Sequence, residues 1–431
     1  VVLSVGMEAS GSAAELAGIM GIELNPYRFV KTDDFSPVAT SRPGIYVAGV
    51  LQGCKDIPQS VMEASAAACS VGISLASARG QNVVEQEFPE EREVRGEEPR
   101  IGVFVCNCGV NIGGIADVPA VVEYARGLPN VVHVEENLFS CSQDTQDKMV
   151  EVMKENELNR IVVAACTPRT HEPLFQETIR NAGLNAYLFD MANIRNQCSW
   201  VHSDDKEKAT EKSKDLIRMS VAKASLLEPI PNMSVDVDSS ALVIGGGVAG
   251  MTAALSLADQ GFPVTLIERS DKLGGAARDI RKSVNGQDVA KFLDGTVNRV
   301  NTHDKITVLV NAEITDAGGF VGNFETVVRA DGEAKTIQHG ATIIATGGQA
   351  ATTDEYLYGK HPAVTRWHDL EHDPDLVKDA DSVVFIQCVG SRDDQRPYCS
   401  RICCTASVSQ AIWMKEQNPD LNIYILYRDI R

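Results

Sequence analysis

Cysteines are the residues of this sequence with the clearest chemistry to offer. The chain has 431 residues and 11 cysteines, an odd number spread along its length. This distribution argues against a secreted disulfide framework and favours free thiols, metal ligands or redox centres. Four of the cysteines fall within 17 residues, in the segment CVGSRDDQRPYCSRICC, at Cys388, Cys399, Cys403 and Cys404.

The spacing of this set of four points to a metal cluster. Cys388 follows the strand-like run VVFIQ, and Cys399 and Cys403 share one face of a helix because they are four residues apart. Four thiolates at one place suit an iron–sulfur cluster or a zinc ion. Zinc cysteines usually come in paired C-x2-C motifs, so the irregular spacing favours a 4Fe–4S cluster, with zinc or structural thiols as the alternatives.

A second set of cysteines follows strand-like runs in the middle of the chain. Its members are Cys106, Cys108, Cys141, Cys166 and Cys198. The carboxyl ends of parallel strands lie along one edge of a sheet, so we expect these residues to meet there and hold a second cluster. Four ligands leave one of the five spare, and the sequence suggests Cys106 or Cys108; small buried residues of core strands are the alternative. Cys54 and Cys69 have no partners in the sequence and are expected to be buried thiols.

A glycine-rich turn in the second half of the chain predicts a dinucleotide site. Gly245, Gly247 and Gly250 form G-x-G-x-x-G between the strand-like ALVI and the helix-like MTAALSLAD. The first two glycines allow a tight turn and close approach to a pyrophosphate, and the third lets helix and strand pack closely. Glu268 ends the next strand, where an acid can accept hydrogen bonds from both ribose hydroxyls. A glycine turn without a ligand is the alternative.

The sequence around this turn favours FAD over NAD, because ER-x-x-x-LGG and the later ATGG resemble the FAD domain of thioredoxin-reductase-like flavoproteins. The residues expected to contact FAD are Gly245, Gly247, Val248, Ala249, Gly250, Glu268, Arg269, Gly274, Gly275, Ala345, Thr346 and Gly347. In that family a C-terminal T-x-x-P-G-I-Y-A-A-G-D segment completes the fold. Here TSRPGIYVAGV stands near the start of the chain, with Gly49 and Val50 expected at a flavin. Val50 replaces the usual aspartate, which weakens the case for a ribityl-phosphate contact, and the helix starting near Gln59 would aim its N-terminus at the flavin edge.

Several domains of the α/β class must position these motifs. Strand-like and helix-like runs alternate, which predicts a Rossmann-like FAD-binding fold plus a separate parallel α/β cluster-binding domain. We predict the C-terminal lobe of a preceding FAD-binding module over 1–80, an acidic linker over 81–100, a cysteine-rich α/β iron–sulfur domain over 101–228, an FAD-binding Rossmann-like domain over 241–353, and the start of a nicotinamide-domain-like region over 354–431. In the last region the set of four cysteines replaces the glycine loop of a nicotinamide domain. The sequence is therefore expected to be a window across two tandem flavin modules.

Composition and charge exclude several classes of function. The net charge of −19 has the wrong sign for a nucleic-acid groove or an anionic membrane surface. No stretch approaches ~20 uninterrupted apolar residues, so no membrane span is predicted. With 44% hydrophobic residues the chain can build cores, which excludes a disordered chain. His171 and Glu172 are interpreted as a polar helix cap, and no Ser–His–Asp or paired-carboxylate arrangement supports a hydrolase.

Longer motifs resemble the A-subunit family of heterodisulfide reductase over residues 101–431: VFVCNCGVNIGG, NLFSCSQDTQ, VVAACTPRTHEPLFQ, NIRNQCSWVH, VIGGGVAGMTAALSLADQGF and QCVGSRD…PYCSRICC. The resemblance implies FAD at Gly245 and Glu268, a 4Fe–4S cluster on the set of four cysteines and a second cluster in the cysteine-rich domain. It implies a cytoplasmic, oligomeric subunit of an anaerobic redox complex, with electron bifurcation in some members. The implied partners are heterodisulfide reductase B-like and C-like subunits, ferredoxin, hydrogenase or formate dehydrogenase, or aryl-CoA reductase subunits.

Three hypotheses about function follow. The first is an electron-transferring subunit that passes electrons between partner proteins through FAD and clusters. The second is a partly degenerate scaffold that only binds partners, which the intact cysteines and glycines argue against. The third is a stand-alone NAD(P)-linked disulfide reductase, which needs a redox C-x-x-C and a second glycine loop, and the sequence has neither.

Overall fold

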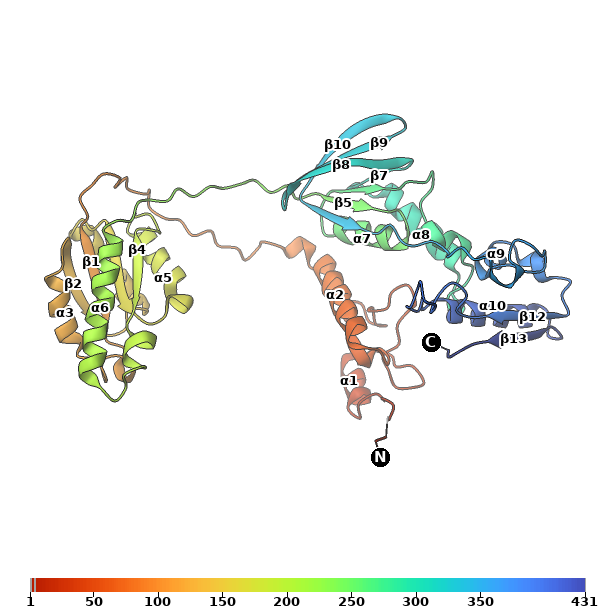
Figure 1. Ribbon diagram of the computed structural model, residues 1–431, viewed down its shortest axis with the longest axis horizontal. Helices are drawn as coiled ribbons and strands as arrows, with labels where there is room; N and C mark the ends of the chain where they lie inside the picture. The colour runs from red at the N-terminus through yellow and green to blue at the C-terminus, as the bar shows by residue number, and fades with distance from the viewer. Residues whose placement is uncertain (1, 4, 431) are drawn as a thin grey trace. The chain divides into compact units, whose positions relative to one another are not determined.

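The computed structural model describes residues 2–3 and 5–430 of the chain (Figure 1). These residues divide into two units. One contains the residues up to Asn82 together with those from Val235 onward, and we call it the glycine-loop unit. The other contains Val83–Ser234, and we call it the five-cysteine unit. Parallel strands alternate with helices in both units, so the predicted α/β class is confirmed.

The five-cysteine unit is built around one parallel sheet of order β2-β1-β3-β4. Its strands are Ile101–Cys106 (β1), Val131–Asn137 (β2), Arg160–Ala165 (β3) and Phe189–Asn193 (β4). Its helices are Val118–Arg126 (α3), Gln143–Glu155 (α4), Pro168–Asn181 (α5) and Lys206–Ala224 (α6). Helix α3 packs on α6 and α4 packs on α5, and every residue of β1 and β3 is buried between the helical layers. The carboxyl ends of the four strands share one edge of the sheet because all of them run parallel.

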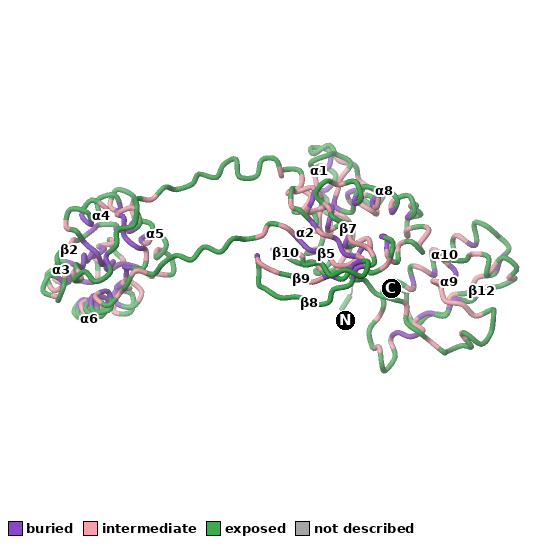
Figure 2. Tube along the Cα trace, turned by 90° about the horizontal axis from the view of Figure 1, so that it is seen from above, coloured by how far each residue is buried: buried purple, intermediate pink, exposed green. Residues whose placement is uncertain are grey.

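Helix caps and an apolar interior explain why the sequence folds this way. The side chain of Asp117 accepts a hydrogen bond from the backbone N–H of Ala120 at the start of α3, and Thr167 caps α5 in the same manner by accepting from Arg169. The strands are rich in β-branched residues that pack well between two helical layers. Figure 2 shows the buried residues concentrated inside this unit.

The segment that precedes β1 packs against the five-cysteine unit. Val94 is fully buried there. The side-chain amide of Asn185 donates hydrogen bonds to the carboxylate of Glu91 at 2.9 Å and to the carbonyl of Ile230 at 3.0 Å, so one residue ties the entering chain to the leaving chain. Part of the stretch predicted as an acidic linker over 81–100 is therefore attached to this unit.

The glycine-loop unit contains a second parallel sheet, of order β11-β5-β6-β7. Its strands are Ala241–Ile244 (β5), Val264–Ile267 (β6), Ile306–Leu309 (β7) and Ala341–Ile344 (β11), with helices Val248–Ala258 (α7) and Val289–Thr302 (α8) packed together beside it. An antiparallel sheet lies between β7 and β11 in sequence and consists of Ala312–Phe320 (β8), Asn323–Ala330 (β9) and Glu333–His339 (β10). This is the Rossmann-like arrangement that the sequence predicts.

The C-terminal part of the same unit begins another β-α-β element. Strands Ser382–Ile386 (β12) and Asn422–Leu426 (β13) pair in parallel, and Cys403–Gln417 (α10) connects them. Helix Trp367–His372 (α9) packs against α10. A small apolar cluster of Leu370, Phe385, Met414 and Leu421 forms its interior.

The N-terminal part of the glycine-loop unit contains helices Ala13–Met20 (α1) and Ile57–Ser74 (α2). Helix α2 begins two residues before the predicted start at Gln59, because Asp56 and Gln59 form a capping box at its N-terminus. The ring of Phe35 stacks on that of Phe292 with 4.0 Å between centroids. Among the described residues, every helix falls short of the length and hydrophobicity that a bilayer span requires.

Candidate functional site

The glycine turn after β5 has the backbone geometry of a nucleotide-binding loop. Gly245 has a φ of 109°, and a Cβ at this position would lie 2.3 Å from the carbonyl oxygen of Ala345. A Cβ on Gly250 would lie 1.8 Å from the carbonyl oxygen of Gly245, so only glycine lets α7 approach β5. No described atom lies within 4 Å of where a Cβ on Gly247 would be. The three positions therefore provide a tight turn, close helix–strand packing and room for a pyrophosphate.

The N-terminus of α7 begins at the same turn. Gly247 precedes the helix and has no side chain to cap it, and Val248 and Ala249 form the first turn. The free N–H groups and the helix dipole make this position favourable for an anion. The N–H of Gly274 donates to the carbonyl of Gly246 at 2.8 Å, which brings the later glycine pair against the turn.

Glu268 fixes the turn from the end of β6. Its carboxylate accepts hydrogen bonds from the N–H of Gly246 at 2.7 Å and from the N–H and hydroxyl of Ser270 at 2.7 and 2.8 Å. Burial raises the pKa of Glu268, but these hydrogen bonds and the charge of Arg278 outweigh burial, so the pKa lies below its usual value. The carboxylate is therefore ionised and suited to accept hydrogen bonds from ribose hydroxyls.

Of the other residues predicted to contact FAD, several lie against the glycine turn and two are exposed. A Cβ on Gly275 would lie 3.1 Å from the Cα of Gly247, so this glycine belongs to the loop. Ala345 and Thr346 follow β11 and lie beside Gly245. Arg269 and Gly347 are exposed.

Gly49 and Val50 lie in a short 3-10 helix of the N-terminal part, Gly49–Leu51. The N–H of Gly49 donates to the carboxylate of Glu63 at 3.0 Å, and that carboxylate also pairs with the buried ammonium group of Lys55. The predicted helix N-terminus at the flavin edge is occupied by its own cap at Asp56. A flavin contact at Gly49 and Val50 stays a prediction.

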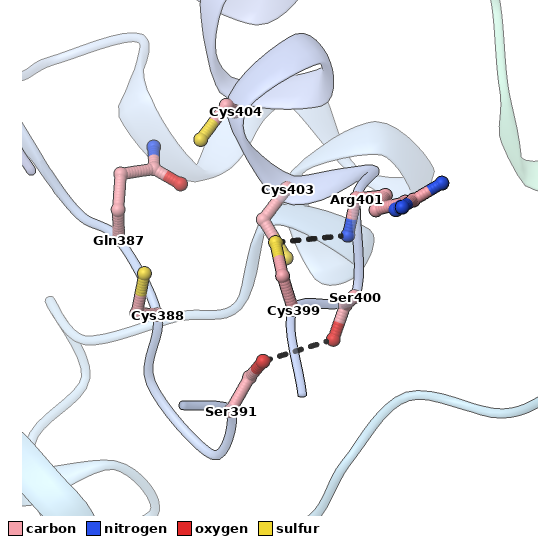
Figure 3. Close-up of a pocket in the computed structure, with 8 residues that line it drawn as sticks. All are labelled: Gln387, Cys388, Ser391, Cys399, Ser400, Arg401, Cys403 and Cys404. Atoms are coloured by element: carbon pink, nitrogen blue, oxygen red, sulfur yellow. Dashed lines mark hydrogen bonds between the residues drawn. The ribbon is translucent and has the colours of Figure 1, made fainter. Parts of the chain in front are cut away.

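The four cysteines of the C-terminal segment line one hollow (Figure 3). Cys388 follows β12, Cys403 and Cys404 begin α10, and Cys399 lies in the loop between these elements. The prediction that Cys399 and Cys403 share one face of a helix is therefore wrong, because the helix begins only at Cys403. The rest of the lining consists of Gln387, Ser391, Ser400 and Arg401. The structure thus brings together the whole set that the sequence grouped by spacing.

Hydrogen bonds to sulfur and unusual backbone angles shape this loop. The backbone N–H of Arg401 donates to the Sγ of Cys399 at 3.3 Å. The guanidinium of Arg392, which is paired with Asp429, donates to the Sγ of Cys388 at 3.8 Å. Cys388, Arg392 and Arg401 have φ values of 65°, 58° and 62°, a region that non-glycine residues rarely adopt. Such angles persist only where the surroundings hold them, and they cluster at functional sites.

Four thiols around one hollow form a donor set that suits an iron–sulfur cluster or a zinc ion. Burial raises the pKa of the Cys403 thiol, and the charges of the three neighbouring cysteines raise it further. A bound cation would offset this effect and favour the thiolate of Cys403. Among the described residues, no group of three or more His, Cys, Asp or Glu side chains is placed to hold one metal ion.

The five-cysteine sheet brings four of its cysteines close to one another. Burial raises the pKa of the Cys106 thiol, and the charges of Cys108 and Cys141 raise it further. Burial also raises the pKa of Cys166; the charge of Arg195 opposes this effect, and Cys106 and Cys141 add to it. The interacting thiols are therefore Cys106, Cys108, Cys141 and Cys166.

Cys198 follows the last strand of the sheet. It is fully buried in the π-helical turn Arg195–Ser199 that follows β4 and packs within the apolar core. Burial raises its pKa, and among the described residues the groups that oppose this effect are Ser213 and Lys212. The sequence suggested Cys106 or Cys108 as the spare member of the set, and the choice of the four ligands stays a prediction.

The remaining predictions concern two isolated cysteines and a histidine at a helix. Cys54 is exposed, so its prediction as a buried thiol is wrong, and Cys69 is partly buried with its Sγ 3.5 Å from the amide of Gln260. His171 lies within α5, whose cap is Thr167 instead. No role of Gln387 or Arg392 follows from the sequence, and their position within four residues of Cys388 is the one signal that marks them.

Comparison with known proteins assigns the chain to a family. Residues 243–311 match a family model described as an NAD(P)-binding Rossmann-like domain. The chain is 37% identical over 437 residues to the A subunit of the H2:CoB-CoM heterodisulfide, ferredoxin reductase of Methanothermobacter thermautotrophicus, covering 79% of this chain and 66% of that protein. It is 32% identical to a heterodisulfide reductase A-subunit-like protein of Archaeoglobus profundus, covering 78% of this chain and 68% of that protein. The chain belongs to the A-subunit family of heterodisulfide reductase.

This membership confirms the resemblance that the motifs predict. The chain spans about two thirds of the length of its relatives in this A-subunit family. A relative in Methanopyrus kandleri, 36% identical with 78% of this chain and 66% of that protein covered, is named as an iron–sulfur A subunit of CoB–CoM heterodisulfide reductase. Among solved structures, L-proline dehydrogenase from P. horikoshii is 22% identical and covers 44% of this chain and 36% of that one, with a TM-score of 0.30, too low to establish a shared fold.

Proposed function

We propose that this chain acts as an electron-transferring iron–sulfur flavoprotein within a larger redox complex. The observation that supports this most is the hollow lined by Cys388, Cys399, Cys403 and Cys404. It stands at the end of a parallel strand, where a nicotinamide domain would carry its glycine loop. A nucleotide-binding turn lies in the same unit, so one body offers sites for two kinds of electron carrier.

The turn after β5 is the proposed FAD site. Gly247 leaves room for the pyrophosphate at the uncapped N-terminus of α7, and the ionised Glu268 accepts hydrogen bonds from the ribose. The matching family model names NAD(P); the choice of FAD is supported by the ER-x-x-x-LGG and ATGG segments that surround the turn. When bound, FAD exchanges electrons singly or in pairs.

Each set of interacting cysteines is proposed to hold one 4Fe–4S cluster. The second site consists of Cys106, Cys108, Cys141 and Cys166 at the edge of the five-cysteine sheet. Burial raises the pKa of Cys106, Cys166 and Cys403, so these thiols release protons when metal binds. Protein chains of this kind supply the thiolates and exclude water, and the clusters carry the electron.

The partners and the mode of electron transfer follow from the family. Ferredoxin forms part of one relative's printed name, which supports ferredoxin as a partner here. We further propose cytoplasmic association with heterodisulfide reductase B-like and C-like subunits, and with hydrogenase, formate dehydrogenase or aryl-CoA reductase subunits. Single-electron carriers on either side of a flavin permit electron bifurcation, in which the two electrons of a pair leave at different potentials.

Anaerobic purification followed by iron, sulfide, zinc and flavin analysis tests the proposal. We expect about eight irons per chain, four for each cluster, and about one FAD. EPR of the reduced protein should show two cluster signals. Iron-free protein that carries a nicotinamide nucleotide would refute the proposal, and protein with neither iron nor flavin would favour the scaffold.

A further inference from the structure

The side chain of Gln387 differs from the other polar groups around the four-cysteine hollow. It directly follows β12 and precedes Cys388, and only 9% of the residue is exposed. Its amide nitrogen is fully buried and has no hydrogen-bond partner among the described residues. Buried polar groups in native proteins are nearly always paired, so an unpaired one requires an explanation, and a bound ligand at the neighbouring hollow is one.

This amide lies at the hollow that the thiols line. Gln387 shares the lining with all four cysteines, and Figure 3 shows its amide group at the same hollow as the sulfur atoms of Cys388 and Cys404. Another N–H of the loop already bonds to sulfur, from Arg401 to Cys399. The buried amide therefore lies beside sulfur acceptors, and Figure 3 draws its oxygen on the side of the hollow.

Only the nitrogen end of the amide suits this site. The nitrogen and oxygen of a glutamine amide exchange places by rotation about one bond, so their assignment follows from the surroundings. Thiolates and cluster sulfides are hydrogen-bond acceptors that carry negative charge. They attract an amide N–H and repel an amide oxygen.

We propose that Gln387 is a positioning residue that donates an N–H hydrogen bond to a sulfur atom of the cluster held by the four cysteines. The inference rests on the cluster proposed for this site. The reduced cluster carries one more negative charge than the oxidised cluster, so an N–H donor stabilises the reduced form more. Gln387 therefore raises the reduction potential of this cluster.

Redox titration of the full chain, followed by EPR, tests this role. Gln387→Leu keeps the size of the side chain and removes the donor, and Gln387→Glu at alkaline pH keeps the shape and replaces the N–H by a carboxylate oxygen. In both variants we expect unchanged iron and flavin and a shift of the cluster equilibrium of about tenfold toward the oxidised form, which is about 59 mV for one electron.

Gln410→Leu is the matched control. Gln410 is 1% exposed in α10; its amide nitrogen already donates to the carbonyl of Trp367 and to Glu371, whereas its amide oxygen has no partner among the described residues. This variant should lose stability and keep the potential of the cluster, which separates a structural effect from the proposed one.

The outcomes separate this inference from the proposed function. An iron-loaded cluster of unchanged potential in both Gln387 variants would refute the role of Gln387 alone, whereas a wild-type chain without iron would refute the proposed function. If the variants lose the cluster, pulsed EPR of wild-type chain labelled with nitrogen-15 in the glutamine amides decides. A nitrogen coupling to the reduced cluster supports the hydrogen bond, and its absence refutes it.

Discussion

In the glycine-loop unit, four cysteines that are neighbours in sequence line one hollow between β12 and α10. In the five-cysteine unit, the four interacting cysteines are spread from Cys106 to Cys166 and meet because parallel strands end at the same edge of a sheet. A short loop brings the first set of cysteines together, whereas the second set is brought together by the fold of the whole five-cysteine unit. Cysteines can therefore be brought together either by closeness in the sequence or by the arrangement of strands in a sheet.

The two sites are supported by different amounts of packing. The loop of the first site contains three non-glycine residues at positive φ and rests on a small apolar cluster around Phe385 and Met414. The second site stands on β1 and β3, every residue of which is buried. We infer that the loop would depend on the cluster proposed for it to keep its structure, whereas the sheet holds its thiols in place without metal.

Replacing one ligand in each set should give the largest effect. Cys399→Ala and Cys141→Ala should each remove one cluster, about half of the iron, and leave the EPR signal of the other, because the two sites belong to different units. Iron analysis and EPR of the anaerobic proteins measure this. Cys54→Ala, at an exposed cysteine, is the control and should keep all the iron. Loss of all iron from one single variant would show that the sites are not independent.

Removing the metal should affect the two units unequally. After anaerobic chelation we expect amide hydrogens of residues 388–402 to exchange at least roughly tenfold faster, because strained backbone lacks other support. Exchange in β1 and β3 should change little, because their burial does not depend on metal. Hydrogen-exchange mass spectrometry of loaded and metal-free chain measures both. Equal loss of protection in both regions would contradict the difference in rigidity.

Replacing Cys198 tests whether this buried cysteine is a cluster ligand or only part of the core of the five-cysteine unit. Cys198→Ala should keep the full iron content and lower the free energy of unfolding by about 1 kcal/mol, because it removes a buried sulfur from the core. Cys108→Ala should lose one cluster. Iron analysis and denaturant unfolding of both variants measure the contrast. Iron lost from Cys198→Ala and kept in Cys108→Ala would restore the assignment that the sequence suggested.

The smallest expected effect is on the stability of the folded chain in acid, through Asp369 of α9. In α9, a hydrogen bond from Arg366 lowers the pKa of Asp369 from 3.8 to about 2, against the effect of burial. Because the folded pKa is the lower one, ionised Asp369 stabilises the fold above pH 3.8, and this contribution disappears as the pH falls through about 2. The side chain is 30% exposed, so the contribution is about 1 kcal/mol or less.

Asp369→Asn should therefore be less stable than wild type near pH 5 and equal to it near pH 2, as measured by urea unfolding of the glycine-loop unit at about these two pH values. Asp379→Asn, at an exposed position, is the control and should match wild type throughout. A stability difference that persists in acid would show that Asp369 acts through something other than its charge.

The features of the glycine turn and of the set of four cysteines can be predicted from the sequence because they are local. The roles of Gly245, Gly247 and Gly250 follow from spacing alone, because each role depends on the backbone of one turn. The set of four cysteines is equally local. The convergence of the second set needed one additional step, the parallel order of the strands, which alternating runs of strand and helix already indicate.

What the sequence could not supply depends on packing between distant residues. Cys198 is set apart because the π-helical turn after β4 carries it into the core, and no spacing rule predicts that turn. The unpaired amide of Gln387 can be recognised only when all of its neighbours are known. Val94 is buried although the composition around it is that of a solvated linker.

Asn185 has a consequence for how such a protein arises. By bonding to both Glu91 and Ile230, it closes the five-cysteine unit where the chain enters and leaves. A domain whose ends meet in this way can be inserted into a loop of a host gene without disturbing either fold. The residues up to Asn82 and from Val235 onward make up the other unit, so the five-cysteine unit interrupts that unit as one continuous segment.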